Sequence, residues 1–190
     1  MAETPEKPRL GYWKIRGLAQ QIRYELEYLG VDYDETLYEQ GDAPDYDRSQ
    51  WLEEKDTLGL QFPNLPYFID GNFKLTETNA IMKYIAHKHG PELLGGDAPT
   101  MAKVEMVAAN VGDLKGQITM PCYTSGDRAA ITANMMQKVK PIVNYLGDKP
   151  FLVGSQVTYV DFILFEMCDL MNWISEGSLF STFPTLEQYW

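Results

Sequence analysis

The sequence predicts two domains, an α/β domain in the first half of the chain and an all-helical domain in the second half. Strand and helix signals alternate up to about residue 90, and only helical periodicity follows beyond residue 100. Between them, residues 90–99 hold three glycines and two prolines, a composition typical of a linker. We therefore divide the chain into an α/β domain over 8–89, a linker over 90–99 and a helical domain over 100–190.

The α/β domain begins with a strand, a helix and a second strand. Arg9–Trp13 is short and aromatic, as strands are. Leu18–Leu29 repeats apolar residues at helical spacing, and Gly30 suits the left-handed conformation that ends many helices. Tyr33–Tyr38 predicts the second strand. A strand–helix–strand unit normally gives a parallel pair.

A hairpin and a helix complete this domain. Two alternating runs over residues 67–75 flank Asp70-Gly71, a strong hairpin signal. A helix is expected from about Thr76 or Thr78 to His89. The order βαβ followed by ββα predicts a thioredoxin-like fold.

Helical patterns dominate the second half. The expected helices cover 101–123, 129–146 and 159–173. Thr158 followed by Asp161 before an apolar run has the form of a capping box, in which the two ends satisfy exposed helix donors. Leu186, Tyr189 and Trp190 lie on one face of a further helix that the chain is expected to begin near residue 183.

Composition excludes several kinds of function. The net charge of −11 argues against bulk attraction to nucleic acid or an anionic membrane surface. Val157–Ile174 is the most apolar stretch, but its three acidic residues argue against a membrane span. Residues 1–8 show no apolar signal segment, so a soluble, cytoplasmic protein is expected.

No protein-borne redox or metal chemistry is indicated. Cys122 and Cys168 stand apart in apolar stretches and suit buried thiols in a reducing compartment. His87 and His89, the only histidines, are spaced poorly for one metal on one helix face. A thioredoxin-like domain without its own paired cysteines can instead use an external thiol.

Five segments in order carry a resemblance to a known family. Together they resemble the mu class of cytosolic glutathione transferases, and the similarity extends from about Leu10 to Trp190. The resemblance implies a glutathione transferase fold, glutathione as co-substrate, a homodimer and a role in detoxification. The segments are residues 11–19, 41–51, 62–67, 75–81 and 154–162.

Tyr12 is the catalytic residue that the resemblance implies. In the family, the matching hydroxyl donates a hydrogen bond to the glutathione sulfur. A thiol with a pKa of about 8.5 is mostly protonated at neutral pH, and a hydrogen bond to the thiolate lowers that pKa. Without the flanking motif, Tyr12 would be interpreted as an ordinary aromatic core residue of a strand.

The remaining glutathione-binding residues are also given by the resemblance. Indole N–H groups and an ammonium, those of Trp13, Trp51 and Lys55, would hold the glycine carboxylate. A cis peptide bond before Pro66 would present the backbone of Leu65 to the cysteinyl part. Leu18 and Asn64 complete this part of the predicted site.

Glu77 and Thr78 stand where the mu class normally has glutamine and serine. At the start of a helix, backbone N–H groups would bind the γ-glutamyl carboxylate, with the Thr78 hydroxyl as a further donor. Glu77 could pair with the γ-glutamyl ammonium, which Asp113 would reach from the neighbouring subunit. The effect of this departure on affinity for glutathione is left open.

Two further predictions concern the binding of the electrophile and the contact between subunits. Tyr123 and Gly116 match positions that face the electrophile, and Lys115 stands where arginine is usual, so substrate preference is open. Phe62 matches an aromatic residue that inserts into the partner subunit. Relative to the family, the chain is expected to lack the last helix and tail, which would leave the electrophile pocket open on one side.

The predicted function is the addition of the glutathione thiolate to small hydrophobic electrophiles. Two alternatives remain: a non-catalytic protein that binds glutathione or hydrophobic ligands, and a glutathione-dependent isomerase. Neither needs a metal. An intact Tyr12 favours the transferase over the binding protein.

Overall fold

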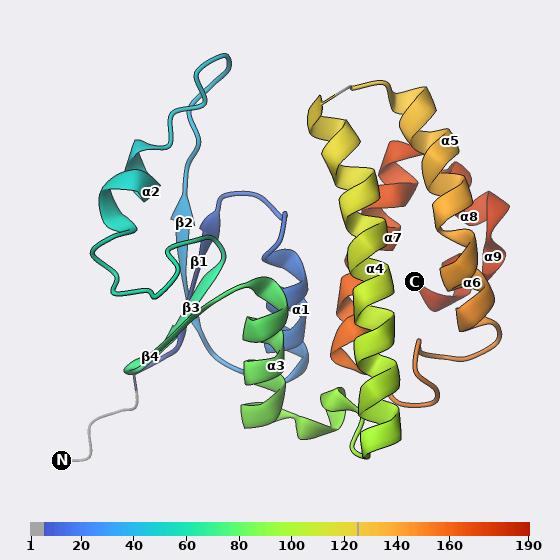
Figure 1. Ribbon diagram of the computed structural model, residues 1–190, viewed down its shortest axis with the longest axis horizontal. Coiled ribbons are helices and arrows are strands. Elements are labelled where there is room, and N and C mark those ends of the chain that lie inside the picture. The colour runs from blue at the N-terminus through green and yellow to red at the C-terminus, as the bar shows by residue number, and fades with distance from the viewer. Residues whose placement is uncertain (1–5, 125) are drawn as a thin grey trace. The chain divides into compact units, whose positions relative to one another are not determined.

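The computed structural model describes residues 6–124 and 126–190 (Figure 1). The chain divides between Gly90 and Pro91 into two units, each with its own core. The two units are described in turn.

The first unit contains a four-stranded sheet of order β2-β1-β3-β4. β1 and β2 are parallel, whereas β3 is antiparallel to both β1 and β4. This mixed sheet confirms the predicted thioredoxin-like arrangement. Its elements are β1 (Arg9–Trp13), α1 (Gln20–Tyr28), β2 (Asp34–Tyr38), α2 (Ser49–Glu54), β3 (Tyr67–Asp70), β4 (Phe73–Thr76) and α3 (Thr78–His89).

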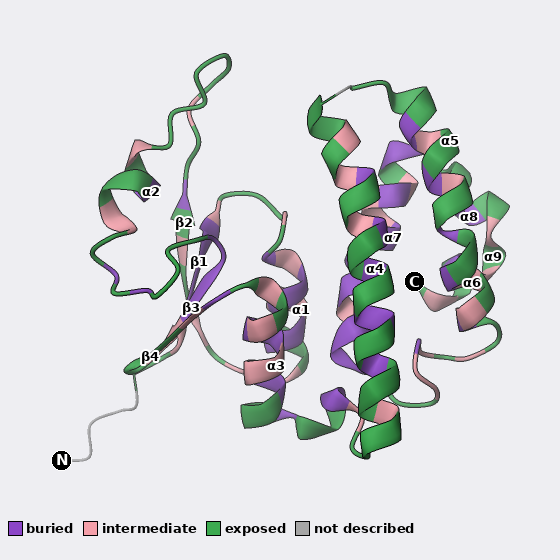
Figure 2. Ribbon diagram, in the orientation of Figure 1, coloured by how far each residue is buried: buried purple, intermediate pink, exposed green. Residues whose placement is uncertain are grey.

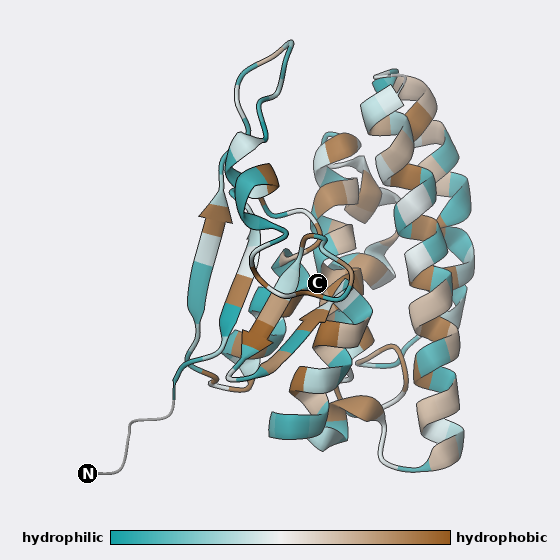
Figure 3. Cartoon of the chain, turned by 60° about the vertical axis from the view of Figure 1, so that its left-hand side comes forward, coloured by the Kyte–Doolittle hydropathy of each residue, from teal (hydrophilic) through white to brown (hydrophobic). Residues whose placement is uncertain are grey.

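The core of the first unit lies between the sheet and the pair α1 and α3 (Figures 1 and 2). Ile22 and Leu26 of α1 are four residues apart, so they share one face of the helix, and both are fully buried. Ile81 and Ile85 do the same in α3. Hydropathy differs between the strands: β2 is hydrophilic over its first three residues, Asp34-Glu35-Thr36, whereas apolar and polar residues alternate along β4 (Figure 3).

Two local differences from the sequence prediction occur beside the predicted site. α1 begins at Gln20 rather than Leu18. In the preceding turn the Leu18 N–H donates a hydrogen bond to the Tyr12 hydroxyl at 2.9 Å, and Gly17 has a φ of +45°. The short helix α2 was not predicted. It follows a turn in which Asp47 accepts hydrogen bonds from the backbone and hydroxyl of Ser49.

The second unit is helical, as predicted. α4 packs against α5 and α7, which also contact each other. The single helix predicted over 129–146 is wrong: it is divided into α5 and α6, because Pro141 has no N–H to donate to residue 137. The elements are η1 (Pro91–Leu94), α4 (Ala98–Thr124), α5 (Arg128–Lys138), α6 (Lys140–Leu146), α7 (Tyr159–Ile174), α8 (Ser178–Thr182) and α9 (Pro184–Tyr189).

The predicted capping box at the start of α7 is confirmed. The Asp161 carboxylate accepts hydrogen bonds from the Thr158 N–H at 2.7 Å and from the Leu152 N–H at 2.8 Å. The Tyr189 hydroxyl donates to the same side chain at 3.0 Å. One buried carboxylate thus joins the loop before α7, the start of α7 and α9.

Glu25 in α1 is also a buried acid, but within the described parts of the chain it lacks the hydrogen-bond donors that surround Asp161. Its side chain is 0% exposed, and neither carboxylate oxygen has a hydrogen-bond partner among the described residues. Burial raises the pKa of this carboxyl well above its usual value of 4.5. An unpaired buried charge is costly, so the folded state favours the protonated form.

We expect this group to make the protein less stable as pH rises. Below pH 4.5 both folded and unfolded states bind the proton, and Glu25 imposes no pH-dependent cost. Between that value and the raised folded pKa, the free energy of unfolding should fall by about 1.4 kcal/mol per pH unit. Glu25→Gln should flatten this slope in urea titrations between pH 5 and about 8.

The exposed neighbour on the same helix provides the control. Glu27→Gln should leave the pH dependence of the wild type unchanged. Equal slopes for the wild type and Glu25→Gln would show that Glu25 is ionised in the folded protein.

Candidate functional site

Tyr12 occupies the penultimate position of β1, with its ring 5% exposed. Its hydroxyl accepts a hydrogen bond from the Leu18 N–H at 2.9 Å. The turn between them depends on Gly17, since a Cβ at this position would lie 2.6 Å from the Tyr12 hydroxyl. The hydroxyl is therefore held by a backbone donor and closely covered by the turn.

Leu18 also links this turn to the start of α3. The Thr78 hydroxyl donates to the Leu18 carbonyl at 3.2 Å. Three predicted site residues, Tyr12, Leu18 and Thr78, are therefore connected by two hydrogen bonds, although they are up to 66 positions apart along the chain.

The start of α3 has an unusual backbone. Glu77 has a φ of +73°, a conformation that residues other than glycine rarely adopt. Its exposed side chain accepts a hydrogen bond from the Asn64 amide at 3.4 Å. α3 has 12 residues, so its first N–H groups and its dipole can attract an anion.

The peptide bond between Leu65 and Pro66 is cis, as the resemblance implied. Both residues are buried and lie directly before β3. Outside the sheet ladder, the Leu65 backbone makes no hydrogen bond to another backbone group within residues 6–124 and 126–190.

Trp13, Trp51 and Lys55 lie around the end of β2 and α2. Trp51 is 7% exposed and stacks on Tyr67, with ring centroids 6.1 Å apart. Trp13 contacts the Tyr38 ring edge-on at 6.4 Å. Lys55 directly follows α2, and its backbone N–H donates a hydrogen bond to the Trp51 carbonyl at 2.9 Å. The two indoles thus both contact the Tyr38 ring, and Lys55 lies at the end of the helix that carries Trp51.

Phe62 lies in the loop between α2 and β3 and is 74% exposed. Transfer of so much apolar area from water is favourable, so a phenylalanine this exposed is a candidate contact residue.

The other predicted residues lie on α4 of the second unit. Asp113 and Gly116 are exposed, and no described atom lies within 4 Å of the place where a Cβ of Gly116 would be. Tyr123 is 81% exposed near the end of the helix. Lys115 lies between Asp113 and Gly116 in the same helix. Burial lowers the pKa of its ammonium to about 8, against the opposing effect of Glu166.

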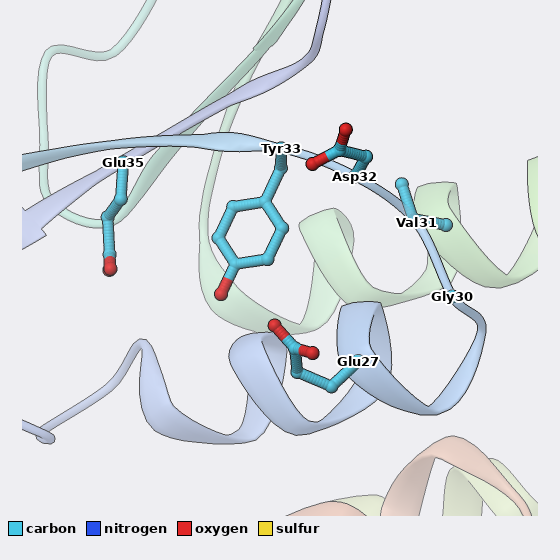
Figure 4. A pocket seen from close by; sticks show the side chains of 6 residues that line it. All are labelled: Glu27, Gly30, Val31, Asp32, Tyr33 and Glu35. Carbon is cyan, nitrogen blue, oxygen red and sulfur yellow. The ribbon is translucent and has the colours of Figure 1, made fainter.

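A separate open pocket lies between the end of α1 and β2 (Figure 4). Acidic side chains surround Tyr33, and burial together with Glu35 and Glu27 raises the pKa of this tyrosine. Glu35 is already paired with Arg23 at 2.6 Å. The pocket contains none of the predicted site residues. Within the described parts of the chain, no group of three acidic, histidine or cysteine side chains could hold a metal ion.

The structure thus brings together the predicted residues of the first unit in two connected groups. One contains Tyr12, Leu18 and Thr78, and the other contains Trp13, Trp51 and Lys55. Sequence reasoning missed Gly17, Tyr38 and Tyr67, which shape these groups. Gly17 lies inside a quoted motif, but no sequence signal joins Tyr38 to Tyr67, 29 positions away.

Comparison with known proteins gives concordant matches over nearly the whole chain. Residues 8–87 match the family "Glutathione S-transferase, N-terminal domain", and residues 113–190 match a family of glutathione S-transferase C-terminal domains. Glutathione S-transferase Mu 1 of Bos taurus is 44% identical over 95% of this chain and 83% of its own length. Glutathione S-transferase Mu 4 of Mus musculus has the same identity and coverage.

Solved structures give the same fold. The crystal structure of the glutathione S-transferase Blo t 8 aligns with a TM-score of 0.84 at 30% identity, over 95% of this chain and 84% of that one. The pi-class glutathione S-transferase of Onchocerca volvulus also aligns with a TM-score of 0.84, at 21% identity over 96% of this chain and 85% of that one. In the described parts of the chain, no helix is long and apolar enough to span a bilayer.

Proposed function

The chain belongs to the glutathione S-transferase family and is a glutathione transferase of the mu type, and from this premise we propose that Tyr12 activates the thiol of glutathione bound by the first unit. The observation that carries the proposal is the placement of the Tyr12 hydroxyl at the end of β1, held by the Leu18 N–H. The co-substrate is glutathione.

The chemistry at Tyr12 is the stabilisation of a thiolate. A hydroxyl that accepts a hydrogen bond becomes a stronger donor through cooperative polarisation, so the Leu18 N–H strengthens donation by Tyr12. Donation to the sulfur favours the thiolate over the thiol and lowers the thiol pKa. The released proton goes to solvent. The sulfur then forms a bond to the electrophilic carbon, and either a π bond of the electrophile opens and takes up a proton from solvent or a leaving group departs with its bonding electron pair.

Other groups are proposed to hold the γ-glutamyl and cysteinyl parts of the tripeptide. The N-terminus of α3 binds the γ-glutamyl carboxylate, the Thr78 hydroxyl joins it by turning its one proton from the Leu18 carbonyl to the ligand, and the Glu77 carboxylate faces the ammonium. Leu65 pairs with the cysteinyl backbone, beside Asn64. These interactions orient the sulfur toward its target, a legitimate source of rate.

The glycine carboxylate is proposed to bind the two indoles, Trp13 and Trp51, and Lys55. Indole N–H groups donate only, and an ammonium adds a charge-assisted hydrogen bond, so the set suits an anion. Gly116 and Tyr123 are proposed to line the electrophile site on α4.

We also propose a cytoplasmic homodimer that detoxifies electrophiles. Exposed Phe62 supports a subunit contact, and Asp113, exposed on α4, would serve the partner's site. Cys122 and Cys168 are both free, which suits a reducing compartment; Cys168 is buried as expected, but the expectation of a buried thiol is wrong for Cys122, which is exposed near the end of α4.

Tyr12→Phe should keep glutathione binding but lose most of the rate. Phenylalanine retains the ring but has no proton to donate to the sulfur. By analogy with oxyanion donors, kcat for an aromatic electrophile should fall by about 100-fold, with a nearly unchanged KM for glutathione. The thiol pKa of bound glutathione, followed by thiolate absorbance, should rise toward its value in solution. A fully active variant would remove Tyr12 from its proposed role.

Gly17→Ala should displace the Tyr12 hydroxyl. The new Cβ would lie 2.6 Å from that oxygen, at a φ of +45°. A shift of about 1 Å costs up to about 100-fold in a positioned reaction, so kcat/KM should fall by at least about 10-fold. Gly30→Ala is the matched control, because Gly30 also has a positive φ, +62°, but no described atom lies within 4 Å of its Cβ position. Equal losses in the two variants would assign the effect to backbone strain.

Phe62→Ala should weaken the proposed dimer. An aromatic residue buried at a contact is a typical hot spot worth about 2 kcal/mol or more, so the dimer dissociation constant should rise at least about 30-fold. Sedimentation equilibrium would measure it. Leu37→Ala removes another exposed apolar side chain of the same unit, on β2, and should leave the constant unchanged. A monomeric wild-type protein at micromolar concentration would remove the dimer proposal.

A further inference from the structure

A chain of two phenols and one carboxylate lies where β2 meets α2. The Tyr38 hydroxyl donates to Glu54 Oε2 at 2.8 Å, and the Tyr38 and Tyr67 hydroxyl oxygens are 3.1 Å apart. Because the Tyr38 proton is directed to the carboxylate, Tyr67 is the donor to Tyr38. Burial, together with the hydrogen bonds to Tyr67 and Glu54, raises the pKa of Tyr38, so this proton is retained. We call these three residues the phenol chain.

The rings of the phenol chain contact both indoles of the proposed glycine site. Tyr38 meets Trp51 edge-on, with centroids 5.3 Å apart, and meets Trp13 edge-on at 6.4 Å. Tyr67 stacks on Trp51 at an interplanar angle of 21°. Tyr38 therefore stands between the two indoles, and Tyr67 supports one of them.

The Tyr67 ring in turn depends on the absence of a side chain in β1. A Cβ built on Gly11 would lie 2.1 Å from two Tyr67 ring atoms. Tyr67 is fully buried. The ring is therefore fixed directly against the backbone of the central sheet, and it can serve as a rigid base for Trp51.

α2 needs such an attachment because it is short. It has six residues, and a helix of that length is not stable on propensity alone. In Figure 1 it lies beside β2, apart from α1 and α3. Glu54 is its last residue and Lys55 comes next, so the hydrogen bond from Tyr38 holds the end of α2 from which the Lys55 ammonium projects.

We infer that Tyr38, Tyr67 and Glu54 are positioning residues for the glycine carboxylate of glutathione. They act through Trp51 and Lys55 and do not touch glutathione. Tyr67 and Tyr38 set the plane of the Trp51 indole, and the bond to Glu54 sets the place of Lys55. The inference rests on the proposed function of Trp51 and Lys55.

The test compares glutathione with its glycinamide analogue, in which a primary amide replaces the glycine carboxylate. The wild-type enzyme should prefer glutathione in kcat/KM by roughly 10- to 100-fold, the range expected for hydrogen bonds to a charged group. Tyr38→Phe keeps the ring but breaks the link to Glu54. It should reduce this preference by about fivefold or more, through a higher KM for glutathione alone.

Two further readouts separate positioning from general damage. The kcat at saturating glutathione should stay within about twofold of the wild type. The thiol pKa of bound glutathione should stay within about 0.3 of the wild-type value. Changes of this size correspond to a free energy much smaller than that of one hydrogen bond. Tyr84→Phe is the matched control: its hydroxyl also donates to a carboxylate at 2.8 Å, that of Asp70, on the hairpin. It should leave the preference unchanged.

Three other substitutions, at two positions, keep the inference testable if Tyr38→Phe folds poorly. Tyr67→Phe removes one hydroxyl and keeps the stack on Trp51, so a smaller loss of preference is expected. Glu54→Gln keeps an acceptor for Tyr38 and should retain most of the preference, whereas Glu54→Ala should not.

Each outcome has one meaning. A wild-type enzyme that does not distinguish the two thiols would overturn the proposed glycine site and the inference with it. A wild-type preference that persists in Tyr38→Phe and in Glu54→Ala would leave the glycine site standing and overturn the positioning role. Equal losses on both thiols would also overturn it, since they would show a general structural effect.

Discussion

The hydrogen bond from the Leu18 N–H to the Tyr12 hydroxyl is the contact on which the chemistry proposed for the first unit depends. It draws the turn after β1 over the tyrosine and delays the start of α1 to Gln20. The same residue, through its carbonyl, receives the Thr78 hydroxyl and so connects this turn to α3. The thiol end and the γ-glutamyl end of the proposed site are thus linked through a single residue, Leu18.

The two units treat buried acids differently. Asp161 is surrounded by donors that must stay in place, and its burial joins three segments. Glu25 is as deeply buried but has no partner among the described residues, so it opposes folding when ionised. A buried carboxylate is therefore neither stabilising nor destabilising by itself; the donors around it decide the sign.

Sequence patterns predicted those parts of the fold that depend on near neighbours. β1, the hairpin and α3 follow from alternation, from Asp70-Gly71 and from helical spacing, and the capping box needs only four residues. The resemblance supplied Tyr12 and the cis bond before Pro66, which residue patterns alone could not give.

The missed features depend on contacts between distant residues. α2 is attached by contacts with residues 11 to 16 positions away, so its six residues carry little signal of their own. The division of α5 from α6 was present in the sequence as Pro141, but apolar spacing on either side outweighed it. From the sequence, Gly11 is an ordinary glycine in a strand. The structure shows that the ring of Tyr67 occupies the space that a side chain at Gly11 would need.

The three ends of glutathione are proposed to be held by three kinds of interaction, and this determines how the site can change. Backbone groups at Leu65 tolerate most side-chain substitutions. The γ-glutamyl end relies on the N-terminus of α3, where an acid is favoured by the helix dipole, so Glu77 can replace a glutamine without opposing the fold. In the proposed site, that added charge attracts the γ-glutamyl ammonium and repels the neighbouring carboxylate, so it acts on affinity for glutathione in opposite directions. In the proposed site the glycine end depends on side chains alone, and these are positioned by the phenol chain. Under this proposal, selection for glutathione over related thiols is concentrated at the glycine end, which is the end closest to α2.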